Sequence, residues 1–155
     1  MTNPDLLITG ATLPDGTRAD ILVEGTRVSA VGQGLSSASA TKIDADGLIA
    51  LPGLVDLHTH LREPGFEQSE TVLTGTQAAA MGGYTAVHAM ANTSPVADTA
   101  GVVEQVYRLG QEAGYLDVFP IGAVTQGLRG EALSEIGAMA DSVARVRVFS
   151  DDGHC

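Results

Sequence analysis

Residues 48–65 read LIALPGLVDLHTHLREPG, in which an almost wholly apolar run at 48–55 is followed by two histidines. Such a run is typical of a strand buried on both faces of a parallel sheet, and active sites of α/β folds lie at the C-terminal ends of these strands. Side chains of a strand alternate between its faces, so His58 and His60 share one face and form a candidate metal clamp. Arg62 follows on that face if the strand continues, where it could hold an anionic group beside the metal.

After Pro52, predicted strands alternate with predicted helices, which indicates parallel βαβ units. The strands are predicted at residues 54–61, 84–92, 118–125 and 144–150. The helices are predicted at residues 69–81, between Thr99 and Gly114, and around Leu133, Ile136 and Met139, with glycines as the stops of the first two. Arg147 is unusual inside a barrel strand, and we expect it to pair with a carboxylate.

Four strands and three helices make the first half of a (β/α)8 barrel, which takes about 250 residues when complete. The chain has 155 residues, too few to close one, so we expect it to be part of a longer protein. Residues 1–52 differ in kind, because short β-like stretches alternate with Gly and Asp turns. Residues 21–24 and 27–31 predict a hairpin, and residues 44–47 a second turn. The predicted domains are 1–52 and 53–155.

Composition narrows the class of partner. The chain has 8 Lys and Arg against 19 Asp and Glu, a formal net charge of −11, which repels nucleic acid and anionic lipid surfaces. The N-terminus lacks the pattern of a secretory signal, and Pro52 and Gly53 interrupt the longest apolar run, so no membrane span is expected. The single cysteine, Cys155, cannot form an internal disulfide. These features predict a cytoplasmic enzyme without nucleic-acid or membrane partners.

Five blocks resemble the dihydroorotases, zinc enzymes of the amidohydrolase superfamily. They are HTHLREPG at 58–65, GGYTAV at 82–87, MANTSP at 90–95, GAVTQGL at 122–128 and FSDDG at 149–153. The resemblance runs from about Leu6 to the end of the chain. It implies an α/β fold in which residues 53–155 supply the first half of a (β/α)8 TIM barrel and residues 1–52 part of a small β-sandwich.

The resemblance implies zinc-dependent, reversible hydrolysis of dihydroorotate to N-carbamoyl-aspartate in pyrimidine biosynthesis. One or two zinc ions would lower the pKa of bound water to about 7 and polarise the amide carbonyl. His58 and His60 would be ligands, with an aspartate in place of the carboxylated lysine of other superfamily members. Asp151 is the first choice for that ligand and Asp152 the second, because alternation lets only one face inward.

The resemblance also assigns substrate binding. Arg62 has a planar fork that matches a carboxylate, and dihydroorotases place an asparagine such as Asn92 on the same group. His88 is interpreted as a core histidine, with a metal role as the lesser alternative, and His154 and Cys155 as loop residues. Two further histidine ligands and the acid/base aspartate are expected beyond Cys155, so this chain alone should not turn over substrate. The expected partners are the small-molecule substrate, a second copy in a homo-oligomer, and aspartate transcarbamoylase as a candidate.

Two alternatives remain open. Hydantoinases, dihydropyrimidinases and allantoinases are similar cyclic amidohydrolases, but the Arg-Glu-Pro-Gly run at 62–65 and the lack of a lysine near the fourth strand argue against them. A non-catalytic dihydroorotase-like subunit could scaffold aspartate transcarbamoylase. Loss of the metal histidines marks such subunits, and this chain keeps His58 and His60.

Overall fold

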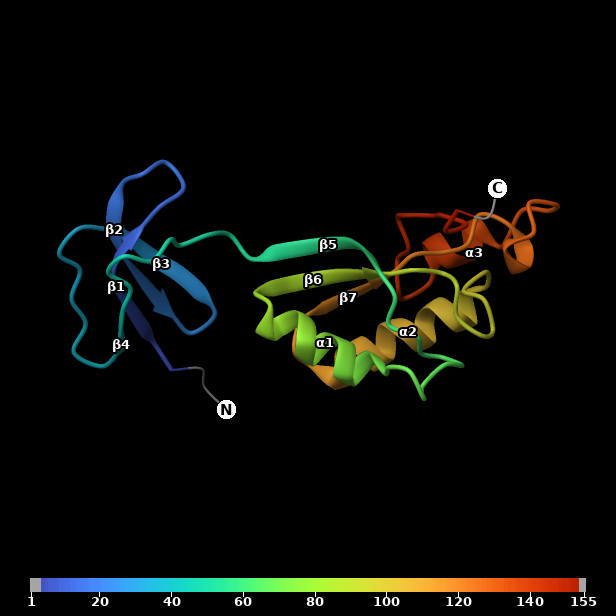
Figure 1. Cartoon of the computed structure of the whole chain (residues 1–155), viewed down its shortest axis with the longest axis horizontal. Coiled ribbons are helices and arrows are strands. Elements are labelled where there is room, and N and C mark those ends of the chain that lie inside the picture. Colours follow the sequence, from blue (N-terminus) through green and yellow to red (C-terminus); the bar gives the residue numbers. More distant parts are fainter. Residues whose placement is uncertain (1–3, 154–155) are drawn as a thin grey trace. The chain divides into compact units, whose positions relative to one another are not determined.

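The computed structural model describes residues 4–153. The chain divides into two compact units, Met1–Pro52 and Gly53–Cys155 (Figure 1). Within the described residues, no helix is long and apolar enough to cross a membrane. The interpretation of His154 and Cys155 as loop residues falls outside the described range.

The first unit contains one four-stranded sheet in the order β3-β2-β1-β4. Its strands are β1 (Leu6–Thr12), β2 (Arg18–Glu24), β3 (Arg27–Gly32) and β4 (Thr41–Asp44). The antiparallel pairing of β2 with β3 confirms the predicted hairpin. The predicted turn after β4 is also present, where the Leu48 N–H donates to the Ala45 carbonyl at 3.0 Å. Beyond it, a parallel bridge joins Ile49 to Thr12 of β1.

The second unit is built on a three-stranded parallel sheet in the order β5-β6-β7. The strands are β5 (Leu54–Thr59), β6 (Tyr84–Ala89) and β7 (Asp117–Pro120). Its helices are α1 (Val72–Met81), α2 (Ala100–Ala113), α3 (Ile136–Asp141) and the 3-10 turn η1 (Gln126–Leu128). Helices α1 and α2 pack against β6 and β7 on one side of the sheet (Figure 1). The strand and helix alternation predicted from the sequence is therefore present for three strands.

The ends of α1 and α2 follow local sequence rules. Thr71 caps α1, since its hydroxyl oxygen accepts a hydrogen bond from the Thr74 N–H at 3.1 Å. In return, the Thr74 hydroxyl oxygen accepts a hydrogen bond from the Thr71 N–H. This reciprocal capping box starts the helix three residues later than predicted. Gly114 ends α2 in the left-handed conformation, with φ of 69°, which glycine adopts without a Cβ penalty.

Two buried apolar clusters hold the second unit together. One joins the sheet to α1 and α2 through Leu61, Val72, Val87, Ala89, Val106 and Val118. The other lies around α3 and the segments near it, and contains Ala91, Ala97, Val102, Val103, Ala123, Met139, Ala144 and Val146. Gly110 lets α2 approach β7, because a Cβ at this position would lie 2.5 Å from the Val118 Cβ.

We expect Gly110→Ala to destabilise the second unit by about 1–3 kcal/mol, since the added methyl group forces α2 away from β7. Chemical denaturation of the intact protein would measure the change. Gly101→Ala is the matched control in the same helix, because a Cβ there meets nothing within 4 Å. Equal stability of the Gly110 variant and wild type would contradict this close-packing argument.

Within residues 4–153, the predicted fourth strand, residues 144–150, forms one parallel bridge, between Phe149 and Gly122. The Gly122 N–H donates to the Val148 carbonyl at 3.1 Å, and its own carbonyl accepts the Ser150 N–H at 3.0 Å. Arg145 adopts a left-handed backbone with φ of 46°, which breaks the extended conformation that a strand needs. The prediction was therefore wrong about the length of this strand.

Arg147 also differs from its predicted role. Its guanidinium donates to the backbone carbonyls of Ala140 at 2.8 Å and Val146 at 2.9 Å, and among residues 4–153 it forms no ion pair with a carboxylate. The third helix is shorter than predicted as well. Leu133 lies outside α3, where it is exposed and forms a bridge with Thr125.

Candidate functional site

Two histidines and one aspartate meet at the C-terminal end of β5. His58 is the second-last residue of β5, and His60 lies just beyond the end of this strand. Asp152 comes from the turn after residues 144–150. One ligand atom from each of the three lies within 4.8 Å of the others. His58 Nε2 is 3.0 Å from Asp152 Oδ1, and His60 Nδ1 is 3.9 Å from Asp152 Oδ2. We call these three residues the metal cluster.

A β-bulge orients the two histidines. Asp56 pairs with Val87 and Thr59 pairs with Ala89, so β5 carries one extra residue between these points. The Asp56 carboxylate accepts the His58 N–H at 2.9 Å inside the bulge. Thr59 is the register partner of Ala89 on β6, and the Ala89 side chain is buried in the cluster that joins the sheet to α1 and α2. The imidazoles on either side of Thr59 have centroids 5.1 Å apart, as expected for a shared face.

Asn92, three residues beyond β6, connects two members of the metal cluster. Its Nδ2 donates to Asp152 Oδ2 at 2.7 Å, and its Oδ1, 3.0 Å from His60 Nδ1, is placed to accept a hydrogen bond from that ring. These contacts use one amide proton and one carbonyl lone pair, and leave one of each for another partner. Asn92 therefore supports the cluster and still has hydrogen-bonding capacity.

The structure brings Asp152, the second choice for the aspartate ligand, to the histidines in place of Asp151. The Asp151 carboxylate instead accepts hydrogen bonds from residues 124 and 125, after β7. The two side chains diverge because Asp152 has a left-handed backbone with φ of 51°, so strand alternation does not describe this turn. Asp152 suits a cation, since its half-buried carboxylate has a side chain only 12% exposed and a carboxylate withdrawn from water needs positive or donor partners.

Arg62 and Asn92 line one open pocket beside the metal cluster, together with Phe66 and Ser69. The pocket has a volume of about 560 Å³. Arg62 is exposed and has a left-handed backbone with φ of 61°. In the part of the chain that the structure describes, its guanidinium pairs with no carboxylate. The pocket thus presents a cation and an amide to a ligand.

Two glutamates fix the loop that carries Arg62. Glu63 Oε2 accepts the Val72 N–H at 2.8 Å, at the start of α1. Glu67 Oε1 accepts the Gly65 N–H at 2.8 Å, and this bond holds the pKa of the Glu67 carboxyl below its usual range. Sequence reasoning missed the role of Glu63, although an acidic side chain ahead of a helix start is a usable signal.

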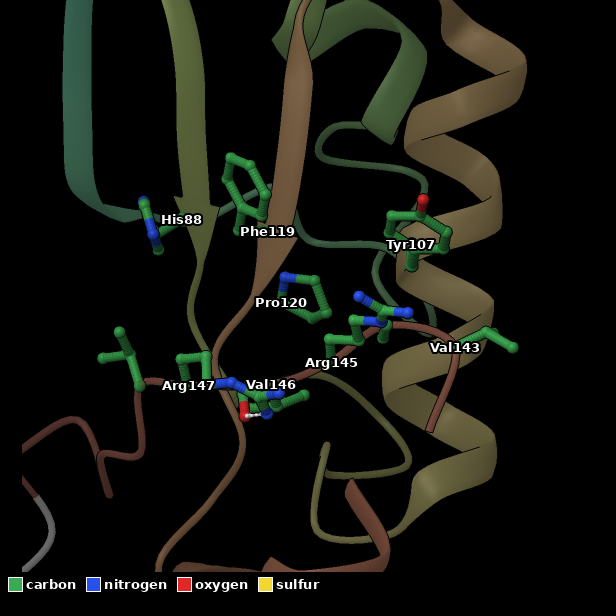
Figure 2. A pocket seen from close by; sticks show the side chains of 10 residues that line it. His88, Tyr107, Phe119, Pro120, Val143, Arg145, Val146 and Arg147 are labelled. Atoms are coloured by element: carbon green, nitrogen blue, oxygen red, sulfur yellow. Dashed lines mark hydrogen bonds between the residues drawn. The ribbon is translucent and has the colours of Figure 1, made fainter. Parts of the chain in front are cut away.

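His88 lies apart from the metal cluster. Figure 2 shows it beside Phe119, and the two ring centroids are 5.2 Å apart. Its Nδ1 is 3.3 Å from the Asp56 carbonyl. Both rings line a second pocket of about 360 Å³, together with Tyr107, Pro120 and residues 143–148 (Figure 2). His88 is half-buried and lines a pocket rather than lying in the core, and its ring packs on an aromatic neighbour.

Comparison with known proteins identifies the kind of molecule that shares these features. The family described as "Dihydro-orotase-like" matches residues 47–154. The chain is 71% identical over 155 residues to a dihydroorotase of Leifsonia xyli subsp. xyli, covering all of this chain and 35% of that protein. It is 54% identical over 142 residues to a dihydroorotase of Mycobacterium tuberculosis, covering 91% of this chain and 33% of that protein. The chain thus spans about a third of the length of these relatives.

Among solved structures, the chain resembles the L-hydantoinase (dihydropyrimidinase) of Arthrobacter aurescens. The TM-score is 0.69 at 27% identity, over 83% of this chain and 29% of that one. An adenine deaminase has a TM-score of 0.57 at 20% identity, over 94% of this chain and 36% of that one, and shares the fold alone. These likenesses show that the mixed α/β architecture is that of the barrel amidohydrolases.

Proposed function

The chain belongs to the dihydro-orotase-like family, and from this premise we propose that it is the metal-binding and substrate-binding part of a zinc-dependent dihydroorotase. The intact protein would interconvert dihydroorotate and N-carbamoyl-aspartate in pyrimidine biosynthesis. The observation that carries the proposal is the position of Asn92. It hydrogen-bonds to the metal cluster and also lines the pocket of Arg62, so the candidate metal and the candidate substrate site adjoin.

The residues of the metal cluster fit zinc. Two imidazole nitrogens and one carboxylate oxygen are the donor types that catalytic zinc sites use. The Asn92 carbonyl beside His60 Nδ1 favours the tautomer with its proton on Nδ1, which keeps the Nε2 lone pair for a ligand bond. When bound, zinc would act as a Lewis acid toward the amide carbonyl of the substrate. Whether one or two ions bind stays a prediction.

The pocket residues would bind and orient the substrate. The Arg62 guanidinium offers two parallel N–H donors to the carboxylate that both dihydroorotate and N-carbamoyl-aspartate carry. The remaining Asn92 amide proton can donate to the same group. With the carboxylate held at this end, the scissile amide of the ring is directed toward the metal cluster. Ring opening then adds the oxygen of water to the amide carbon, breaks the carbon–nitrogen bond and moves one proton to the nitrogen. The acid/base aspartate for this transfer is still expected beyond Cys155.

The proposal includes the architecture of the two units as half of a barrel and part of a β-sandwich. The three parallel strands with α1 and α2 on one side support residues 53–155 as the first half of a (β/α)8 barrel. The four-stranded sheet of residues 6–44 supports residues 1–52 as part of a β-sandwich. The cytoplasmic location, the homo-oligomer and the aspartate transcarbamoylase partner stay predictions.

A substrate comparison on the zinc-loaded intact protein tests the proposal. We expect dihydroorotate to exceed dihydrouracil, which lacks the carboxylate, by about 10⁴-fold in kcat/KM, because the uncharged ring leaves Arg62 without its partner. Hydantoin and allantoin should also be poor substrates. Faster turnover of dihydrouracil or hydantoin would favour the hydantoinase-like alternative. Absence of turnover in a zinc-loaded protein that binds aspartate transcarbamoylase would favour the scaffold alternative.

A further inference from the structure

Asp151 stands next to the proposed metal ligand but makes a different set of contacts. Its Oδ1 accepts the backbone N–H groups of Val124 at 2.8 Å and Thr125 at 3.0 Å. Its Oδ2 accepts the Thr125 hydroxyl at 2.7 Å. This carboxylate is therefore fastened to the segment that follows β7.

Thr125 extends the connection into the next loop. While its hydroxyl donates to Asp151, its oxygen accepts the Gly130 N–H at 3.0 Å. The hydroxyl thus closes the loop of residues 125–130 onto the aspartate. One side chain ties this loop to the turn that carries Asp152.

The Asp152 backbone needs such support. A φ of 51° is uncommon for a residue with a Cβ, although aspartate tolerates it better than most. On one side, the Ser150 hydroxyl accepts the Asp152 N–H at 3.1 Å. Hydrogen bonds from Val124 and Thr125 fix the neighbouring Asp151, so the Asp152 carboxylate is held toward His58 and His60 before any metal arrives.

We propose that Asp151 and Thr125 are positioning residues for the metal ligand Asp152, and that they couple the loop of residues 125–130 to the metal cluster. The inference rests on the proposed function only in taking His58, His60 and Asp152 as the metal site. Neither residue would be a ligand of the metal. They act by restricting Asp152 to the orientation that the cluster needs, as hydrogen-bonded partners around other metal sites do.

The test is Zn²⁺ affinity of the intact protein, measured by competition with a chromophoric chelator. Asp151→Ala and Thr125→Val should each weaken zinc binding by about 10- to 100-fold. Asp151→Asn should remain close to wild type, because the amide oxygen can still accept both backbone N–H groups and the amide nitrogen can donate to the Thr125 oxygen. Thr125→Ser should likewise retain affinity. If Asp151 were itself a ligand, the Asn variant would lose affinity as strongly as Asp152→Asn.

The control variant is Ser134→Ala, which removes a 2.6 Å hydrogen bond from Ser134 to the Ala123 carbonyl without touching Asp151. Its zinc affinity should be unchanged. The absorption spectrum of the Co²⁺-substituted protein adds a second readout, and should change in Asp151→Ala but not in Asp151→Asn. Wild-type affinity and spectrum in both Asp151→Ala and Thr125→Val would overturn the inference, as would an equal loss in Ser134→Ala. Zinc retained in Asp152→Ala and in His58→Ala would instead overturn the metal site itself.

Discussion

Replacing His58 and His60 together with alanine is expected to abolish zinc binding and to lower dihydroorotase activity by several orders of magnitude. The reason is geometric, because the two imidazoles supply two of the three ligand groups that lie within 4.8 Å of one another. Among the described residues this leaves Asp152 as the remaining group of the cluster, and the two histidines expected beyond Cys155 would lack the pair on β5 that completes the zinc site. Zinc content by atomic emission and kcat/KM for dihydroorotate would measure both effects.

His88→Ala is the matched control for this double variant. His88 belongs to β6 of the same sheet, but its ring packs on Phe119 and is not part of the metal cluster. The control should keep its zinc. Full zinc occupancy in the double variant would contradict the assignment of the histidines.

Replacing Arg62 with lysine should lower kcat/KM for dihydroorotate by about 100-fold while zinc content stays at the wild-type level. Lysine preserves the charge but loses the planar fork that binds a carboxylate through two parallel hydrogen bonds. Steady-state kinetics with dihydroorotate, alongside zinc analysis of the same samples, would separate substrate binding from metal binding.

Arg108→Lys provides the control for this substitution. Arg108 is exposed on α2, where it lies 3.9 Å from Glu104, and it does not line the Arg62 pocket. Its kinetics should match wild type. If the Arg62 variant also matched wild type, Arg62 could not be the carboxylate-binding residue, whereas loss of zinc would point to a structural role for the loop.

Much of the second unit follows from local patterns. The apolar run before His58 correctly predicts the strand β5, but burial on both faces was wrong, because Leu54, Val55 and Leu57 are exposed. Period-two alternation predicts a shared face for His58 and His60. Their centroids do lie 5.1 Å apart, with a bulge in β5 that the sequence does not reveal. Gly114 marks the end of α2 because a left-handed residue is needed there.

The parts that escaped prediction depend on backbone conformations that no periodicity encodes. Arg145 and Asp152 both have positive φ values, 46° and 51°, although neither is a glycine. The first shortens the predicted fourth strand, and the second turns Asp152 rather than Asp151 toward the histidines. Alternation left the choice between the two aspartates open. Residues 124 and 125, distant in sequence, donate hydrogen bonds to the Asp151 carboxylate, and these bonds turn Asp151 away from the histidines.

We propose that His58, His60 and Asp152 hold the metal ion. A crystal structure of the zinc-loaded intact protein, with anomalous data collected on both sides of the zinc absorption edge, tests it most directly. We expect an anomalous peak within about 2.0–2.2 Å of one nitrogen of each histidine and one Asp152 oxygen, with the Asp151 carboxylate still hydrogen-bonded to residues 124 and 125. Zinc bound by Asp151, or at a place that involves neither histidine, would contradict it.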